Sequence, residues 1–275
     1  MTDPFLAAVV QMTTTADVPA NRAAAQALVR RAAGLGAAVV ALPEMWPFIG
    51  NNQIRLKASE SLDGPTVGLL SDLARELGIW LFGGSFAERS EDPDRVYNTA
   101  VAMGPDGALV GVYRKIHLFD IEVPGAAFVE SDDVLPGDQA VLVRTPLGTF
   151  GMSTCYDLRF PLLYEQLRQG GADYILVPSA FMAQTGKAHW EVLLRARAIE
   201  QQVYVLAPDQ GGHHNRTRES HGHSMIVDPW GVVVARCPDG PGVALGQIDR
   251  ERLALVRRQL PCGEHRRPFV PPALA

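Results

Sequence analysis

Short apolar runs alternate with helix-like segments along the whole chain. Apolar runs bounded by Gly or Pro are typical of buried strands, and they occur at residues 5–12, 37–44, 79–86, 96–103, 108–118, 148–155, 173–180, 203–208, 223–228, 231–236 and 242–249. Helices are expected at about 21–33, 67–77, 159–169 and 188–202. Buried strands separated by helices predict an α/β protein whose sheets are covered by helices.

The second half of the chain repeats the strand and helix rhythm of the first. No low-complexity linker divides the chain, so we predict a single domain, residues 1–275, with an internal α/β pseudo-repeat. Two stacked sheets with helices outside would use every predicted segment. Residues 119–140 are rich in Pro, Gly and acidic side chains and show little periodicity. We expect them to form a long functional loop.

Charge and composition exclude some functions. The chain has 25 basic and 30 acidic side chains, a net charge of −5, and no block of like charge. Nucleic acid and anionic membranes are therefore not expected as partners, because both require clustered Lys and Arg. The N-terminus lacks the basic region of a signal peptide, its apolar run is too short to span a bilayer, and three cysteines do not make a disulfide framework. We expect a cytoplasmic protein.

Three reactive side chains follow predicted strands. Cys155 ends the run "GTFGMSTC", Glu44 closes "AAVVALPE", and Lys115 interrupts "VGVYRKIHL". A catalytic thiol needs a base or positive surroundings, because a free thiol is mostly protonated at neutral pH. Taken singly, each has a structural alternative: a solvated strand end for the glutamate, a surface lysine, and inert packing for the cysteine. A histidine base also stays open.

The flanking residues favour the catalytic alternative. "LPEMW" (42–46), "YRKIHLFD" (113–120) and "CYDLRFP" (155–161) closely resemble the three signature stretches of the nitrilase, or carbon–nitrogen hydrolase, superfamily. The resemblance covers practically the whole chain. It implies a four-layer α-β-β-α sandwich with an internal pseudo-repeat, and an amide-hydrolysing Glu-Lys-Cys triad.

The resemblance also implies the role of each residue. Cys155 would attack the amide carbon, and Glu44 would act as general base and then as general acid. Lys115 and the backbone N–H of Tyr156 would stabilise the oxyanion, and a thioester would form and be hydrolysed. Glu130, in "VES", would orient Lys115 and the attacking water. This chemistry needs no metal and no cofactor.

Residues near the nucleophile suggest how a substrate is bound. Arg159, four residues after Cys155, would lie one helical turn away, where it could bind a substrate carboxylate or form a structural ion pair. Phe181 and Thr185 follow a predicted strand and could line the acyl pocket. Trp190 is expected in the core. The predicted partner is therefore a small amide with an anionic acyl part.

Further segments resemble the Nit branch of the superfamily. "GGHHNRTRES" (211–220) and "RRQLPCGEHRRP" (257–268) resemble the members that hydrolyse deaminated glutathione more than the ω-amidases. The alternatives are an ω-amidase acting on 2-oxoglutaramate or 2-oxosuccinamate, an acyltransferase using the same thioester, and an inactive homologue that acts through protein contacts. One departure is Lys187, where the branch has Pro, in a segment expected to be a substrate-facing loop. The family usually forms homodimers or higher homo-oligomers.

The histidine-rich segment 211–223 could suggest a metal site. Its histidines, at 213, 214, 221 and 223, have no nearby Cys and no regular helical spacing, which disfavours a metal site or a metal-storage protein. We expect instead a mobile polar loop that contacts an anionic substrate through Arg216 and Arg218. Cys237 and Cys262, in a predicted strand and in the tail, are not expected to be essential.

Overall fold

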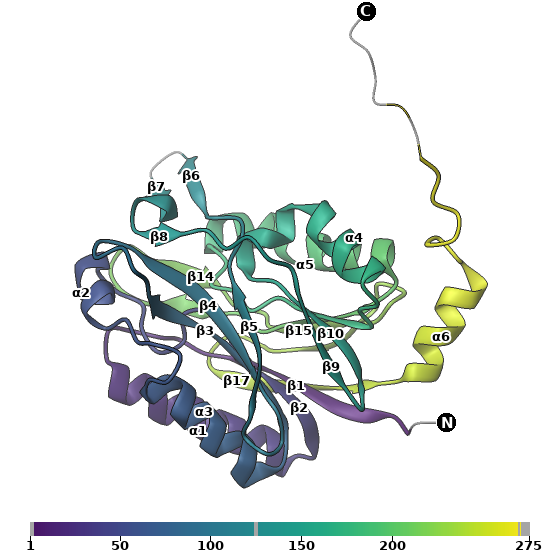
Figure 1. The fold of residues 1–275 in the computed structure, drawn as a ribbon, viewed down its shortest axis with the longest axis horizontal. Helices are drawn as coiled ribbons and strands as arrows, with labels where there is room; N and C mark the ends of the chain where they lie inside the picture. Colours follow the sequence, from purple (N-terminus) through teal and green to yellow (C-terminus); the bar gives the residue numbers. More distant parts are fainter. Residues whose placement is uncertain (1–2, 124–125, 269, 271–275) are drawn as a thin grey trace, which may run out of the picture.

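Two β-sheets lie face to face, and helices cover the outer face of each, as the computed structural model shows (Figure 1). The structure describes residues 3–123, 126–268 and 270. It confirms the four-layer α-β-β-α sandwich. Within the described residues, no helix combines the length and the apolarity needed to cross a bilayer.

The first sheet has the order β17-β1-β2-β3-β4-β5, with β8 beside β4. Its strands are β1 (Phe5–Gln11), β2 (Ala37–Ala41), β3 (Trp80–Arg89), β4 (Val96–Met103), β5 (Leu109–Arg114), β8 (Val134–Leu135) and β17 (Gly242–Ile248). Strands β1, β2 and β3 are parallel, while β4, β5 and β17 pair antiparallel with their neighbours along this order.

The second sheet has the order β16-β15-β12-β11-β10-β9. Its strands are β9 (Val141–Thr145), β10 (Gly148–Met152), β11 (Tyr174–Leu176), β12 (Tyr204–Ala207), β15 (Met225–Val227) and β16 (Val233–Arg236). Here β10, β11 and β12 are parallel, and the flanking strands pair antiparallel. The pairing pattern of the first sheet thus recurs, which is the pseudo-repeat expected from the sequence.

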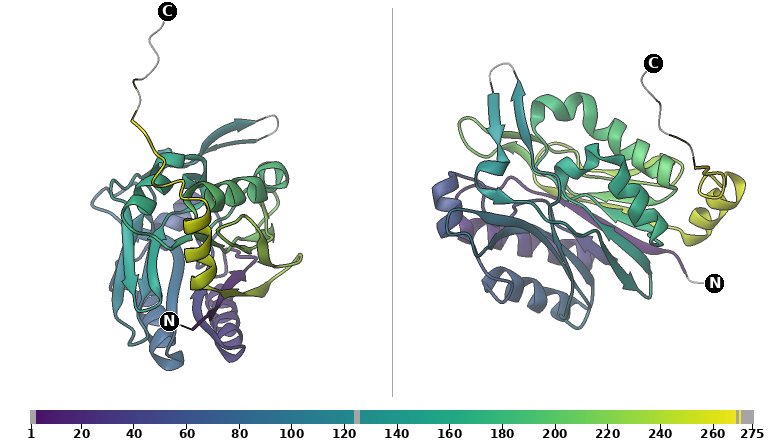
Figure 2. Two further views of the ribbon diagram at one scale, coloured as in Figure 1. Left: turned by 90° about the vertical axis from the view of Figure 1, so that its right-hand side faces the viewer. Right: turned by 45° about the horizontal axis from the view of Figure 1, so that its top comes forward.

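The alternation of side chains along the strands explains the layers (Figure 2). Ala7 and Val9 of β1 belong to the core between the sheets, whereas Ala8 and Val10 pack under α1 and α3. Successive side chains of a strand point to opposite faces, so a strand that is buried on both faces must be apolar throughout. Trp190, on α5, is fully buried in the outer core of the second sheet, as expected.

The helices interleave with the parallel strands. They are α1 (Val18–Gly34), α2 (Asn52–Lys57), α3 (Pro65–Leu77), α4 (Pro161–Gln169), α5 (Ala183–Gln201) and α6 (Arg250–Gln259), with 3₁₀ turns η1 (Glu130–Asp132) and η2 (Cys155–Arg159). Helix α5 begins before the predicted residue 188, so Lys187 lies on an exposed helical turn and not in a loop. That part of the prediction was wrong.

Two segments that we expected to be loops contain hairpins. Residues 119–140 include β6 (Asp120–Val123), β7 (Ala126–Val129), η1 and β8, and the β6–β7 hairpin projects beyond the sandwich in Figure 2. Residues 211–223 include β13 (Gly211–His213) and β14 (Glu219–His221). The strands of both hairpins have only three or four residues each, too few to show a strand period in the sequence.

Candidate active site

Glu44 lies just beyond the carboxyl end of β2, where the chain turns between the two sheets. Its carbonyl oxygen accepts a hydrogen bond from Gln210 Nε2 (3.0 Å), and Met45 N, in a residue with φ of 51°, donates to Ser85 Oγ (3.0 Å). Strand β3 passes so close that a Cβ at Gly84 would lie 2.1 Å from the carbonyl oxygen of the residue before Glu44. Only glycine fits there, and its φ of 59° also favours glycine.

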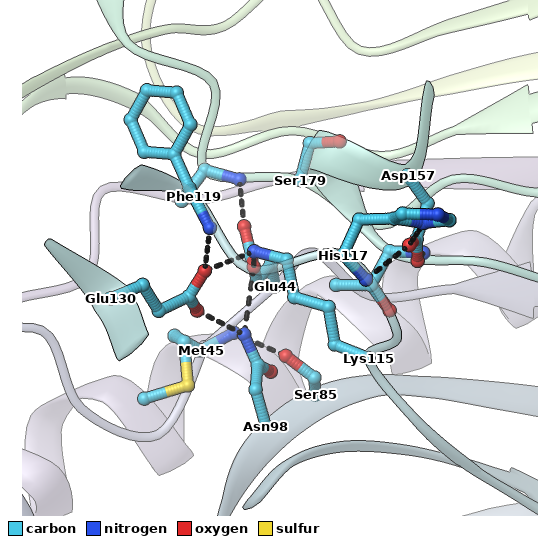
Figure 3. A network of polar contacts seen from close by, with 12 residues as sticks. Glu44, Met45, Ser85, Asn98, Lys115, His117, Phe119, Glu130, Asp157 and Ser179 are labelled. Carbon is cyan, nitrogen blue, oxygen red and sulfur yellow. Dashed lines mark hydrogen bonds and ion pairs between the residues drawn. The ribbon is translucent and has the colours of Figure 1, made fainter. Parts of the chain in front are cut away.

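Four buried polar side chains meet at this strand end (Figure 3). Lys115 Nζ, just after β5, donates to Glu44 Oε1 (3.0 Å) and to Glu130 Oε2 (2.8 Å). Asn98 Nδ2, on β4, donates to the same two carboxylates at 2.8 and 3.2 Å. The other oxygen of Glu44 accepts from the Ala180 N–H at 2.8 Å. The ammonium is therefore held, buried, between two carboxylates.

The charges of this cluster stabilise one another. Burial lowers the pKa of Lys115, but Glu130 and then Glu44 more than compensate, so the pKa lies well above its ordinary value. Burial raises the pKa of Glu130, and Lys115 more than offsets this, so the net shift is downward. Lys115 is thus a fixed cation at neutral pH, which is the property an oxyanion-stabilising group needs.

Cys155 occupies a strained turn between β10 and η2. Its φ is 50°, a left-handed conformation that residues with a Cβ seldom adopt. The turn is held by backbone contacts: Cys155 N donates to the Pro178 carbonyl oxygen (3.0 Å), and Thr154 N donates to Asp157 Oδ2 (2.8 Å). The N–H of Tyr156 follows in the first turn of η2, where a helical N–H has no partner within the helix. The side chain of Cys155 is buried.

The thiol is neutral in the resting site. Burial, and next the charge of Glu44, raise the pKa of Cys155 well above its ordinary value, and Lys115 only partly opposes this. A neutral thiol beside a carboxylate suits general-base catalysis, in which the proton leaves as the sulfur attacks.

Asp157 connects the nucleophile turn to the lysine strand. Its Oδ2 accepts from the Tyr113 hydroxyl on β5 at 2.6 Å, and its Oδ1 lies 2.7 Å from His117 Nδ1 and accepts from the His117 N–H at 3.0 Å. Tyr113 precedes Lys115 by two residues, and Asp157 follows Cys155 by two. The contact therefore sets how β5 and η2 lie relative to one another.

The predicted substrate-binding residues lie around one pocket beside the nucleophile. Arg159, Phe181 and Thr185 line it together with Cys155 and Tyr156, and its other lining residues are Phe119, Ala180 and Met182. The guanidinium of Arg159 lies over the rings of Tyr156 (5.7 Å) and Phe181 (5.2 Å). Among the described residues it forms no ion pair with an acidic side chain, so the structural ion-pair alternative lacks a partner.

Asn98 and Ala180 are site residues that the sequence did not reveal. Asn98 and Thr99 are polar residues within a mostly apolar strand, and a polar residue in a strand usually faces solvent. Only the position of β4 beside Glu44 shows the role of Asn98. Ala180 contributes its backbone N–H, for which no side-chain pattern exists.

Only two of the histidines of residues 211–223 lie side by side, His221 and His223, with ring centres 4.8 Å apart. His214 is buried, with Nδ1 2.7 Å from the Thr14 carbonyl oxygen and Nε2 2.8 Å from Ser220 Oγ. In the part of the chain that the structure describes, no three His, Cys, Asp or Glu side chains are placed to hold a metal ion.

Comparisons with known proteins agree with this geometry. The model of the family described as "Carbon-nitrogen hydrolase" matches residues 6–258. Deaminated glutathione amidase of Mus musculus is 49% identical over 269 residues, which are 96% of this chain and 83% of that protein. Deaminated glutathione amidase of Synechocystis is 41% identical and covers 96% of this chain and 98% of its own length. The crystal structure of Saccharomyces cerevisiae Nit3, a member of branch 10 of the nitrilase superfamily, superposes with a TM-score of 0.88 at 32% identity, over 97% of this chain and 98% of that one.

The sandwich fold and the buried site together define an enzyme of the amide-hydrolysing class. The chain belongs to the carbon–nitrogen hydrolase family. The resemblance read from the three sequence motifs is thereby confirmed.

Proposed function

We propose that the protein hydrolyses deaminated glutathione to 2-oxoglutarate and cysteinylglycine through a thioester on Cys155. The observation that carries the reaction is the buried Glu44–Lys115–Glu130 cluster beside a neutral thiol. The names of relatives 41–49% identical to this chain support the substrate.

The first half of the reaction forms the thioester and releases the amine. Glu44 takes the proton of Cys155 as the sulfur attacks the amide carbon. The carbonyl oxygen becomes negative, and the Lys115 ammonium and the Tyr156 N–H stabilise it. Glu44 then gives its proton to the departing amine, and the acyl group stays on sulfur. Asn98 and Ala180 hold the two oxygens of Glu44, so the carboxylate keeps its orientation through both transfers.

The second half returns the enzyme to its resting state. Water, deprotonated by Glu44, attacks the thioester, and the thiolate leaves and recovers a proton. Glu130 accepts from the Lys115 ammonium and from the Phe119 N–H (2.7 Å), which keeps the lysine aimed at the oxyanion. Glu130 thus acts on lysine orientation and would also order the attacking water.

The acyl half of the proposed substrate suits the pocket. A 2-oxoglutaryl group carries a carboxylate at the end remote from the amide, and Arg159 offers a guanidinium without an acidic partner in the same pocket as the thiol. Phe181 and Thr185 would contact the carbon chain between them.

A comparison of two amides tests the proposal. We expect kcat/KM for deaminated glutathione to exceed that for 2-oxoglutaramate by at least about tenfold, or roughly 1.4 kcal/mol of transition-state binding. Mass spectrometry of enzyme quenched during turnover should find the acyl adduct on Cys155. Equal rates, or a preference for 2-oxoglutaramate, would make the protein an ω-amidase; no hydrolysis of either amide would leave the inactive-homologue alternative.

We also propose that the protein works in the cytoplasm as a homodimer or larger homo-oligomer. Apolar side chains are exposed on two neighbouring helices, Leu162 on α4 and Val192 on α5, and Trp230 is exposed before β16. Light scattering behind size-exclusion chromatography measures the state directly; a monomer at micromolar concentration would contradict this proposal.

A further inference from the structure

Arg218 is a cation near the active site with no part in the reaction described above. It lies between β13 and β14, and its guanidinium lies over the ring of Phe128 on β7, 5.4 Å from the ring centre. A guanidinium at this distance is attracted to the face of an aromatic ring. Arg218 therefore joins two hairpins that lie at the end of the sandwich opposite α6 (Figures 1 and 2).

The backbone of Arg218 is fixed, while its charged group is available. Asn215 Oδ1 accepts from the N–H groups of Thr217 and Arg218 at 2.9 Å each, which folds the tip of the hairpin. No hydrogen bond or ion pair joins the guanidinium to another residue in the described ranges. A half-buried cation without an anionic partner is costly. A ligand that brings a negative group would supply the missing partner.

Aromatic contacts show where Arg218 lies relative to the pocket beside Cys155. The Phe128 ring that its guanidinium faces contacts Phe119, with ring centres 5.8 Å apart, and Phe119 lines that pocket. Arg218 is not one of the pocket-lining residues, so it lies beyond Phe119, outside the space that Arg159 lines. Arg159 lies elsewhere, over the Tyr156 and Phe181 rings.

This difference assigns the two arginines to different halves of a substrate. A departing amine must be within reach of the group that protonates it, so it leaves on the side of Glu44. The acyl chain then occupies the pocket that Arg159 and Phe181 line. Arg218 is placed toward the amine, and Arg159 toward the acyl group.

We propose that Arg218 binds a carboxylate on the amine half of the substrate, so that the enzyme selects amides whose leaving group is an anionic amino acid or peptide. For the substrate proposed above, this is the terminal carboxylate of cysteinylglycine. The inference rests on the proposed function of the Cys155 site. It is separable from it, because the thioester chemistry itself needs no anion on the amine.

The experiment uses three substrates that share one acyl group. They are deaminated glutathione, the same molecule with its terminal carboxylate converted to a primary amide, and 2-oxoglutaramate. Arg218→Gln removes the charge, and Arg258→Gln is the matched control, because Arg258 is exposed on α6, at the opposite end of the sandwich (Figure 1). Arg218→Lys keeps the charge but loses the paired N–H donors.

In wild-type enzyme, amidation should lower kcat/KM on the order of ten- to a hundredfold, the worth of one charge-assisted contact. Arg218→Gln should lower the ratio of kcat/KM for deaminated glutathione to kcat/KM for 2-oxoglutaramate by the same factor. This variant should also have equal kcat/KM for deaminated glutathione and for its terminal amide. Arg258→Gln should keep the wild-type ratio, and the ratio for Arg218→Lys should fall between those of wild type and Arg218→Gln.

Other results overturn the inference. An equal loss on all three substrates in Arg218→Gln would mean that the arginine acts on the Glu44–Lys115 cluster and not on the amine half. The carboxylate contact would also be refuted if Arg218→Gln kept the wild-type ratio of kcat/KM for deaminated glutathione over 2-oxoglutaramate. It would be refuted as well if the wild-type enzyme had the same kcat/KM for deaminated glutathione and for its terminal amide. If wild-type enzyme hydrolyses 2-oxoglutaramate but not deaminated glutathione, the substrate proposal fails instead.

Discussion

Replacing Lys115 by Met tests whether the buried ammonium acts in catalysis or only balances charge. The side chains of Lys115, Glu44 and Glu130 are almost completely buried, and Nζ lies 3.0 and 2.8 Å from the two carboxylates. Removing one partner of a buried ion pair costs about 3–5 kcal/mol of folding stability, because a charge is left without compensation. Removing an oxyanion donor costs on the order of a hundredfold or more in kcat. Lys115→Met should therefore lose both stability and turnover.

A second substitution separates the two effects. Glu130→Gln in the Lys115→Met background leaves Glu44 as the one acidic side chain of the cluster, so it should restore part of the stability measured by urea unfolding. It supplies no cation, so kcat should stay at the level of Lys115→Met, with KM little changed. Recovery of kcat in the double variant, or near-normal kcat in Lys115→Met, would refute the oxyanion role, and the lysine would then be structural.

Three further predictions concern other parts of the site. Cys155→Ala should abolish turnover, whereas alanine at Cys237 or Cys262 should keep most of it; an acyl adduct trapped on either of these would contradict the assignment. Prolonged EDTA treatment should leave the rate unchanged, because the proposed oxyanion partner is an ammonium; stoichiometric zinc whose removal stops the reaction would overturn this. Burial lowers the pKa of His214 from 6.5 to about 4. Between these two pH values His214 therefore binds a proton in the unfolded chain but not in the folded protein. The free energy of unfolding should fall by at most about 3 kcal/mol as the pH drops from about 6.5 to 4. Urea unfolding of His214→Gln should show a weaker pH dependence, with a remainder from His221, whose pKa burial also lowers to about 4.

Much of the fold could be predicted because its strands are buried on both faces. Runs such as residues 5–12 are apolar except for Gln11, and they became β1 and its neighbours with ends shifted by a few residues. Helix α6 was missed, because its sequence is strongly charged and only Leu253 and Val256 among its residues are buried. Strand β9 was missed as well; it is only partly buried at the edge of its sheet.

The residues proposed as the triad could be named from the sequence, but the residues that surround them in the structure could not. Glu44, Lys115 and Cys155 carry reactive groups within recognisable motifs. Asn98 and Arg218 contact residues that are distant in the sequence. Asn98 bonds to Glu44 in the turn after β2, and Arg218 contacts the β6–β7 hairpin. Tertiary contacts of this kind leave no periodic signal.

The contact between Tyr113 and Asp157 makes activity depend on the packing of the two sheets against each other. The base and the ammonium come from the first sheet and the nucleophile from the second, and this contact fastens the two where they meet. Neither half of the pseudo-repeat can assemble the reaction centre alone. If the two sheets did not pack against each other, the thiol would have no acid–base partner. The rate of turnover therefore measures the fraction of molecules in which the two sheets are correctly packed.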